Sequence, residues 1–223
     1  KLKSANGLYL GSTGSGKSVL VQCLLWQAIQ QADVVYVADF KGGVDFSYVW
    51  QEFAYIITEE KKLLVLLNHL ADILEERKRP FKEVDAANIT EYREKSGDYM
   101  QRIVFACDEV AELLDKTGAD KSRKELLAQI EARLALIARQ GRAFGIHLIL
   151  ATQRPDANIL PGQIKNNMNI RICGRADTTL STIIIGDGRA AEQIPHDAQG
   201  RFIMEDGTVF QAYYFSDDTI SKW

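Results

Sequence analysis

The sequence predicts an α/β fold with a largely parallel central sheet, helices on both of its faces and an antiparallel hairpin at its C-terminal end. Short apolar segments rich in β-branched residues alternate along the chain with longer segments of helical periodicity, which is the pattern of strands joined by crossover helices. Near the C-terminus, Glu205-Asp206-Gly207 separates two apolar segments, and such a turn sequence favours a hairpin.

The individual elements follow from the same patterns. Strands are expected where apolar residues form short runs, at residues 7–10, 33–40, 101–107, 146–151 and 169–173, and in the hairpin segments 200–204 and 208–215. Helices are expected where apolar residues recur at helical spacing, at residues 17–31, 59–79, 89–95 and 121–144. Pro80 is expected to end the second helix and Gly145 the fourth, because proline lacks an amide proton and glycine tolerates the turn after a helix.

Composition limits the architecture and the classes of partner. The chain has 223 residues, 46% of them hydrophobic, without a repeat or a linker, which suits one domain over residues 1–223. It begins at Lys1, close to a core-like strand, so we expect a domain of a longer protein. The 27 basic and 30 acidic residues exclude an overall basic field, so any nucleic-acid contact would be local.

The remaining polar and sulfur-containing residues suggest no metal site. Cys23, Cys107 and Cys173 are far apart and are expected as small core residues. His147 lies in an expected strand and is expected as a packed core residue. No apolar run is long enough to cross a bilayer.

A glycine-rich segment predicts a cradle for nucleotide phosphates. Residues 11–18, GSTGSGKS, match G-x-x-x-x-G-K-[ST] between an expected strand and an expected helix. Glycines let backbone N–H groups turn toward phosphate oxygens, and the N-terminus of the helix adds partial positive charge. Lys17 can reach the β- and γ-phosphates, and Ser18 can bind Mg²⁺. The expected cradle consists of Gly11, Ser12, Thr13, Gly14, Ser15, Gly16, Lys17 and Ser18.

Three other expected strands end in polar residues. Asp108 and Glu109 follow an apolar strand. Beside the cradle, Asp108 is expected to act at the Mg²⁺ site and Glu109 to activate water. Acids at the end of a strand also cap the helix that follows, which is the alternative. Gln153 ends another strand and is either a sensor of the γ-phosphate or a solvent-facing loop residue. For Asp39 and Lys41, a catalytic role and a structural salt bridge both remain open.

Four segments together resemble the FtsK/SpoIIIE family of hexameric motors. They are GSTGSGKS, IVFACDEVAELL, GRAFGIHLILATQRP and ILPGQIKNNMNIRI, and the resemblance runs from Gly7 to about Phe215. It implies a RecA-like domain of the HerA/FtsK superfamily, an ATPase that needs ATP and Mg²⁺. It further implies a ring, expected to be a hexamer, that translocates double-stranded DNA in conjugative transfer or chromosome partitioning.

The resemblance also implies residue roles by matched position. Lys17 and Ser18 would bind phosphate and Mg²⁺, Asp108 would be the metal-site acid and Glu109 the catalytic glutamate. By the same matching, Gln153 would be the sensor glutamine. Arg142 would be an arginine finger for the neighbouring subunit, with Arg139 as the reserve candidate. Arg154 and Lys165 would contact DNA phosphates. For Arg142 the alternative is a charge that complements the helix dipole. Arg171 is expected within a strand.

Three functions remain open at this point. DNA translocation is the first, with the parent protein anchored to the inner face of the plasma membrane and this domain in the cytoplasm. The second is a type VII-like secretion ATPase that moves protein substrates, favoured by the segment DFKGG and by the acidic balance. The third is a regulatory module that binds nucleotide without hydrolysis, which the intact Lys17, Ser18, Asp108 and Glu109 argue against.

Overall fold

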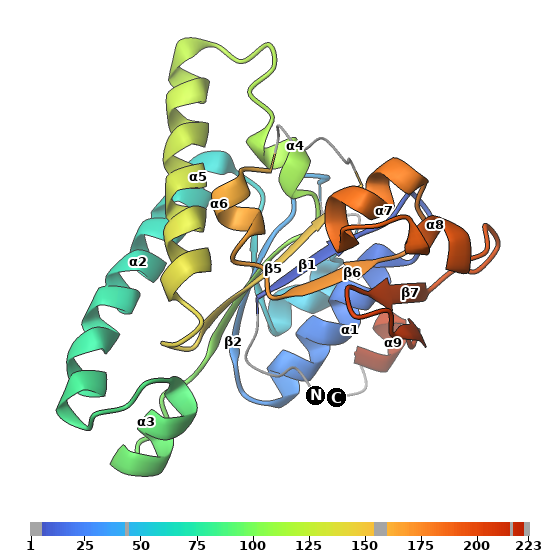
Figure 1. Ribbon diagram of the computed structural model, residues 1–223. Coiled ribbons are helices and arrows are strands. Elements are labelled where there is room, and N and C mark those ends of the chain that lie inside the picture. Colours follow the sequence, from blue (N-terminus) through green and yellow to red (C-terminus); the bar gives the residue numbers. More distant parts are fainter. Residues whose placement is uncertain (1–5, 43–44, 154–159, 215, 221–223) are drawn as a thin grey trace.

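The computed structural model describes residues 6–42, 45–153, 160–214 and 216–220. Within these residues, an eight-stranded sheet has the order β3-β2-β4-β5-β1-β6-β7-β8 (Figure 1). Its strands are β1 Gly7–Leu10, β2 Val34–Ala38, β3 Tyr55–Ile57, β4 Ile103–Cys107, β5 Ile146–Thr152, β6 Ile170–Cys173, β7 Arg201–Met204 and β8 Val209–Gln211. Neighbours from β3 to β6 pair in parallel, whereas β7 and β8 pair antiparallel. The predicted parallel sheet with a terminal hairpin is confirmed.

The parallel arrangement brings distant parts of the chain to one edge of the sheet. Strands β1, β2, β4 and β5 point the same way, so the residues that follow them meet at their carboxyl ends. These residues are Gly11, Asp39, Asp108 and Gln153. The fold therefore assembles the polar strand ends that the sequence presents separately.

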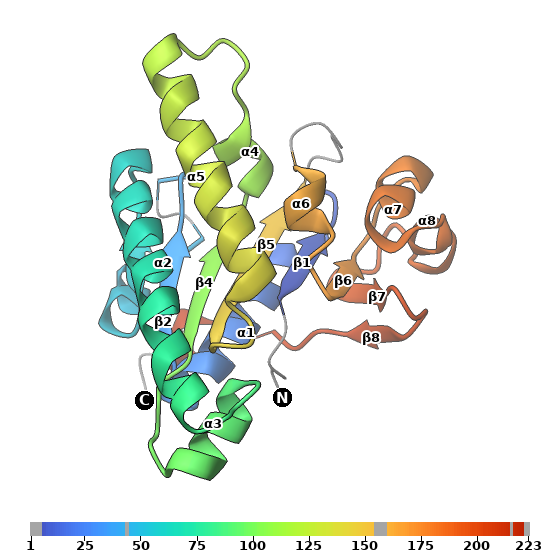
Figure 2. The same ribbon diagram turned by 60° about the vertical axis from the view of Figure 1, so that its left-hand side comes forward.

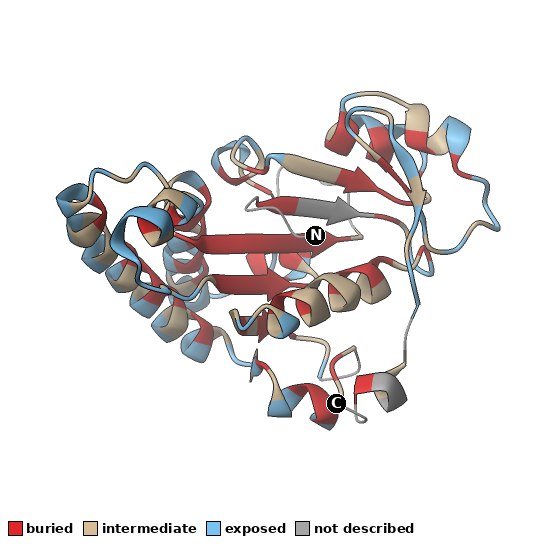
Figure 3. Ribbon diagram, turned by 90° about the horizontal axis from the view of Figure 1, so that it is seen from below, coloured by how far each residue is buried: buried red, intermediate tan, exposed pale blue. Residues whose placement is uncertain are grey.

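Helices cover both faces of the sheet, as predicted. They are α1 Lys17–Gln30, α2 Glu60–Glu83, α3 Ile89–Ser96, α4 Val110–Leu114, α5 Lys121–Gln140, α6 Gly162–Lys165, α7 Thr178–Ile185, α8 Arg189–Gln193 and α9 Asp217–Ile220, with a 3₁₀ turn at Tyr48–Glu52. Figure 2 shows the long helices α2 and α5 side by side on one face, while α1 lies on the other. Strands buried between two helical layers are drawn red in Figure 3.

Strand β4 shows how the sequence builds two cores at once. Ile103, Phe105 and Cys107 pack with α2 and α5, whereas Val104 and Ala106 pack with α1 on the opposite face. Successive side chains of a strand point to opposite faces, so a strand covered on both sides must be apolar throughout. The continuous run IVFAC meets that requirement.

The expected end of the second helix was wrong. Helix α2 continues through Pro80 to Glu83, because a proline in the last turn removes a single backbone hydrogen bond. Phe81 compensates by packing its ring on Tyr92 and Phe144, with centroids 4.7 and 4.9 Å away. The aromatic contact keeps the last turn helical.

The expected end of the fourth helix was also displaced. Helix α5 ends at Gln140, and residues 141–145 form turns in which Phe144 N donates to Gly141 O. A Cβ at Gly141 would lie 2.7 Å from Ile137 O and 2.8 Å from Ile146 O, so glycine is needed there for close backbone approach. Gly145, at φ 77°, then reverses the chain into β5.

Two sequence expectations about the core are settled by burial. Cys107 and Cys173 are buried, and burial raises the pKa of each thiol to about 12. The expectation for Cys23 was wrong, because this residue of α1 is only partly buried and contacts the Tyr213 carbonyl oxygen. His147 is a core residue as expected, and burial, helped by nearby arginines, lowers its pKa to about 4.

No helix among the described residues is both long and apolar enough to cross a membrane.

Candidate nucleotide-binding site

The cradle segment links β1 to α1 through left-handed glycines. Gly14 has φ 76° and Gly16 has φ 92°, a conformation that side chains disfavour. Helix α1 begins without a side-chain cap, so its first N–H groups face the loop. The hydroxyl of Ser15 is buried and has no hydrogen-bond partner among the described residues. An uncapped helix start beside an unused hydroxyl donor fits a phosphate group.

Lys17 and Asp108 form a buried ion pair. Lys17 Nζ lies 2.8 Å from Asp108 Oδ1 and 2.7 Å from the Asp108 carbonyl oxygen, and both side chains are only 3% exposed. Burial opposes ionisation of Asp108, but the ammonium groups of Lys17 and Lys41 outweigh it and hold the pKa of the carboxyl below its usual value. The strand end after β4 is thus joined directly to the cradle.

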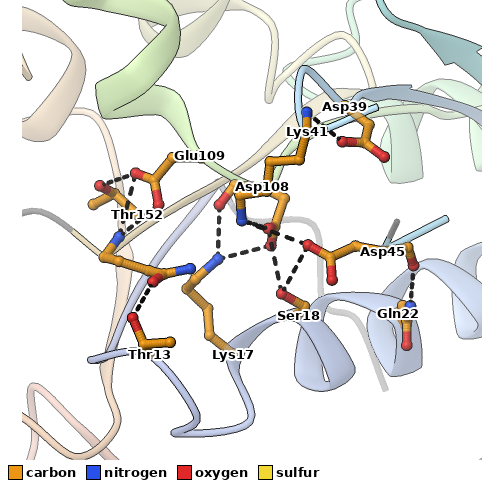
Figure 4. A network of polar contacts seen from close by, with 11 residues as sticks. Thr13, Lys17, Ser18, Gln22, Asp39, Lys41, Asp45, Asp108, Glu109 and Thr152 are labelled. Atoms are coloured by element: carbon orange, nitrogen blue, oxygen red, sulfur yellow. Dashed lines mark hydrogen bonds and ion pairs between the residues drawn. The ribbon is translucent and has the colours of Figure 1, made fainter. Parts of the chain in front are cut away.

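A second ammonium group occupies the other side of the same carboxylate. Lys41 Nζ lies 2.7 Å from Asp108 Oδ2 and 3.5 Å from Asp45 Oδ2. Ser18 Oγ lies 3.3 Å from Asp108 Oδ2 and 3.5 Å from Asp45 Oδ2 (Figure 4). The carboxylates of Asp45 and Asp108 therefore already hold one cation, with the hydroxyl of Ser18 beside them. Hydroxyl and carboxylate oxygens are the ligands that Mg²⁺ prefers.

In this group Lys41 forms ion pairs, and Asp45 joins the residues that the sequence indicated. Lys41 pairs with Asp108 and Asp45, while Asp39 Oδ1 accepts a hydrogen bond from the Lys41 backbone nitrogen at 2.9 Å. Burial, together with the charge of Asp108, raises the pKa of Asp45. Sequence reasoning missed Asp45; the only available signal was an acid a few residues beyond a strand end. The described part of the chain contains no group of three or more His, Cys, Asp or Glu side chains that could hold a metal ion.

Glu109 is held by the next strand. Its Oε1 accepts from Thr152 Oγ1 at 2.5 Å, and its Oε2 accepts from the backbone nitrogen of Gln153 at 3.0 Å. The side-chain oxygen of Gln153 accepts from Thr13 Oγ1 at 2.6 Å. One chain of hydrogen bonds therefore links the ends of β4 and β5 to the cradle, and Figure 4 shows Glu109 pointing toward Thr152.

The remaining predicted residues lie elsewhere. Arg142 is exposed in the turn before β5, and the seven residues of β5 separate it from Gln153 by about 20 Å. It therefore does not reach the cradle of its own chain, and Arg139 is exposed at the same end of α5. Lys165 ends α6 and is partly buried; burial and the neighbouring Arg171 lower its pKa. Arg171 lies in β6 as expected. Arg154 lies outside the described residues.

Solved structures share this fold. A monomeric form of the pCW3 conjugation coupling protein TcpA with ATPγS is 40% identical, with a TM-score of 0.92 over 99% of this chain and 64% of that one. The cytoplasmic domain of the type VII secretion ATPase EccC from Thermomonospora curvata is 27% identical, with a TM-score of 0.69 over 95% of this chain and 26% of that one.

Sequence relatives point the same way. The DNA translocase FtsK of Campylobacter jejuni strain 81-176 is 31% identical over 84% of this chain and 20% of its own length. The DNA translocase SftA of Bacillus subtilis strain 168 is 29% identical over 86% of this chain and 20% of its own length. The chain thus spans about a fifth of these relatives. The model of the FtsK/SpoIIIE family matches residues 1–157. With its glycine-rich segment before α1 and the acids that follow β4, the chain belongs to the FtsK/SpoIIIE family.

Proposed function

We propose that this domain, residues 1–223, hydrolyses ATP to translocate double-stranded DNA as a ring oligomer. The arrangement of Lys17, Asp108 and Glu109 carries the proposal, because it joins a phosphate cradle to a buried acid and a second acid on the adjacent strand ends. The similarity to the DNA translocases FtsK and SftA, at 31% and 29% identity over 84% and 86% of this chain, supports DNA as the cargo.

Nucleotide binding would rearrange the ion pairs. Lys17 would leave Asp108 for the β- and γ-phosphates, and Ser15 would donate its unused hydroxyl proton to a phosphate oxygen. Ser18 and Asp108 would hold Mg²⁺, with Asp45 beside them. The metal, when bound, neutralises developing charge on the phosphates. Lys17 and Lys41 hold the pKa of Asp108 low in this structure, and Mg²⁺ would favour the same ionised form once Lys17 has moved.

Hydrolysis then needs Glu109 to act on water. Its carboxylate would leave Thr152 and the Gln153 backbone and accept a proton from water, whose oxygen forms the new bond to the γ-phosphorus as the bond to the β-phosphate oxygen breaks. Gln153 would report on the γ-phosphate through its hydrogen bond with Thr13. The hydrogen bonds of Glu109 in this structure describe a resting position.

The ring and the DNA contacts belong to the same proposal. Arg142 lies about 20 Å from its own cradle and is exposed, so it would act on a neighbouring subunit of a hexamer. Lys165 and Arg154 would contact DNA phosphates without reading the base sequence. The domain would work in the cytoplasm, with the protein anchored to the inner face of the plasma membrane.

The test is ATP turnover with and without DNA. Double-stranded DNA is expected to stimulate hydrolysis by the assembled protein, and the variant Lys165→Ala is expected to weaken that stimulation uniformly across DNA sequences. A matched control is Lys78→Ala, a surface lysine near the C-terminal end of α2 and thus at the opposite end of that helix from β3. Turnover that no DNA changes would refute DNA as the cargo, while turnover that persists in Lys17→Ala would refute the site.

A secretion ATPase is the second candidate. The likeness to EccC at 27% identity favours it, and so does the DFKGG segment, whose Lys41 contacts Asp108. In that case a substrate peptide would stimulate turnover and DNA would not. The same turnover assay with both additions separates the two functions.

A further inference from the structure

Two carbonyl oxygens of the cradle accept hydrogen bonds from residues far along the chain. A loop that turns its N–H groups toward an anion must place its carbonyl oxygens elsewhere, and these oxygens need donors of their own. Thr13 O and Ser15 O each precede a left-handed glycine of the loop, and their donors are Arg175 Nη2 and Gly200 N. The conformation of the cradle therefore depends on two donors outside the glycine-rich segment.

The side chain of Arg175 joins the cradle to the segment before β7. Its Nη2 lies 2.7 Å from Thr13 O, and its Nη1 donates to His196 O. A Cβ on Gly14 would lie 3.4 Å from Nη2, so the guanidinium group sits against the loop itself. A planar guanidinium group carries several donors in one rigid fork. One side chain thus holds two backbone carbonyl groups in a fixed relation.

The backbone of Arg175 is anchored on the same loop. Its carbonyl oxygen accepts from Ser12 N at 2.8 Å and from Ser12 Oγ at 2.6 Å. A Cβ on Gly11 would lie 3.5 Å from Gly174 Cα, and a Cβ on Gly174 would lie 3.3 Å from Ser15 Cβ. The end of β6 is therefore packed directly on the loop, and the side chain of Arg175 starts from a fixed position.

The segment that Arg175 contacts supplies the second donor. Gly200 N donates to Ser15 O at 2.8 Å, and a Cβ on Gly16 would lie 3.0 Å from the Gly200 backbone. His196 and Gly200 belong to one short segment, residues 196–200, that precedes β7. Loss of the guanidinium group would therefore free Thr13 O and also loosen the segment that holds Ser15 O.

We propose that Arg175 is a positioning residue for phosphate binding, which holds the cradle in the conformation that receives a triphosphate and does not itself contact the nucleotide. The inference rests on the proposed nucleotide-binding function and adds to it a residue outside the glycine-rich segment. A loop with several glycines has many accessible conformations. Without the guanidinium group, the ordering of this loop becomes a cost of binding the nucleotide.

Ligands that share the triphosphate group test this role. Arg175→Ala is expected to bind the Mg²⁺ complexes of ATP and of inorganic tripolyphosphate about tenfold more weakly, which corresponds to about 1.4 kcal/mol. The two losses should match, because Arg175 acts on the phosphates through the loop. Guanidinium chloride, at concentrations that leave the protein folded, should restore much of the affinity. Methylammonium chloride, which carries the same charge without the planar fork, should not.

A conservative variant separates the fork from the charge. Arg175→Lys keeps the positive charge but replaces the two-pronged donor with one ammonium group, so it should still bind both ligands about threefold more weakly. Calorimetry measures the dissociation constant and the fraction of binding-competent protein separately. Wild-type affinity in Arg175→Lys would show that the charge alone suffices and would refute the positioning role, as would equal rescue of Arg175→Ala by the two salts.

Arg189→Ala is the matched control for the loss of a bridging arginine. Arg189 Nε lies 2.7 Å from Asp187 Oδ2, and its Nη2 donates to Glu205 O at 2.8 Å, so this side chain joins the start of α8 to the hairpin and not to the cradle. Its removal should leave both dissociation constants unchanged, whatever the change in melting temperature.

The remaining outcomes distinguish the inference from the function on which it rests. Arg175→Ala that lowers the fraction of competent protein and leaves the dissociation constants unchanged would mark a merely structural residue and refute the proposal. A loss for ATP that tripolyphosphate does not share would also refute it. If Lys17→Ala weakens neither ligand, the nucleotide site itself is wrong. If Lys17→Ala weakens both and the Arg175 variants weaken neither, only the positioning role fails.

Discussion

The ammonium group of Lys41 holds together two carboxylates at the candidate metal position. The variant Lys41→Met keeps the aliphatic stem and removes the charge, which leaves Asp108 paired with Lys17 and takes away the ammonium group that contacts Asp45. We expect this variant to be less stable than the wild type in EDTA. We also expect Mg²⁺ to raise the stability of the variant more than that of the wild type, because in the variant the ion does not compete with the ammonium group of Lys41.

The magnitude follows from the burial of the pair. Lys41 is 26% exposed and Asp108 is 3% exposed, with 2.7 Å between Nζ and Oδ2. Exposed pairs contribute roughly 0–1 kcal/mol and breaking a fully buried pair costs about 3–5 kcal/mol. Asp108 keeps Lys17, so the loss should be about 1–2 kcal/mol. For a domain of this size that corresponds to a fall in melting temperature of about 2–8 °C.

Thermal and urea unfolding in EDTA, followed by titration with Mg²⁺, measure both effects. Lys62→Met is the matched control, since Lys62 pairs with Glu59 on the surface, where the side chains are 69% and 59% exposed. The control should change stability by less than about 0.5 kcal/mol. Equal stability of Lys41→Met and Lys62→Met in EDTA, or equal responses to Mg²⁺, would contradict the reasoning.

Three further predictions concern catalysis, assembly and pH. Glu109→Gln should bind ATP normally and lose turnover at least about 100-fold, because a carboxamide cannot accept the proton of the attacking water; single-turnover assays show whether chemistry has slowed. Arg142→Ala should leave nucleotide affinity unchanged and abolish turnover by the assembled ring. If Arg142 acts across the subunit boundary, rings that mix Arg142→Ala subunits with Glu109→Gln subunits should regain turnover. The pKa of His147 in the folded protein is about 4, below the value of an unfolded histidine. The neutral side chain therefore contributes to the free energy of unfolding in full above about pH 6.5, and this contribution is lost as the pH falls toward 4. Wild-type protein should therefore lose about 2–3 kcal/mol more stability than His147→Gln between pH 7 and pH 4, and parallel losses in urea unfolding would refute a buried neutral histidine.

Local sequence patterns foretold most of the fold. The parallel strands β1, β2, β4, β5 and β6 and the helices α1, α2, α3 and α5 were expected from periodicity and lie where they were placed, apart from their ends. The missed elements are β3 and the helices α4, α6, α7, α8 and α9, of which α7 is the longest with eight residues. Strand β3 has three residues and α6 has four, too few to show a hydrophobic period. Helix ends were misjudged where aromatic packing at Phe81 and close backbone contact at Gly141 outweighed local propensity.

The candidate site was predictable to the extent that it lies on strand ends. Asp108, Glu109 and Gln153 could be placed near the cradle, because parallel strands bring their carboxyl ends to one edge. Their mutual contacts could not be placed. Asp45 joins the site through side-chain contacts, and Glu109 turns toward Thr152. Contacts of this kind depend on how loops are packed, which no spacing in the sequence records.

By itself, the sequence determined the phosphate cradle, the acids that accompany it and the family, because a glycine-rich loop before a helix takes its conformation from its own residues. Only the tertiary structure decided that Lys17 and Lys41 share the carboxylate of Asp108. It alone also brought the guanidinium group of Arg175, from the segment after β6, beside Thr13. The physical reason is the same in both cases. These contacts join segments that lie far apart in the chain, and their geometry follows from the order and twist of the strands between them.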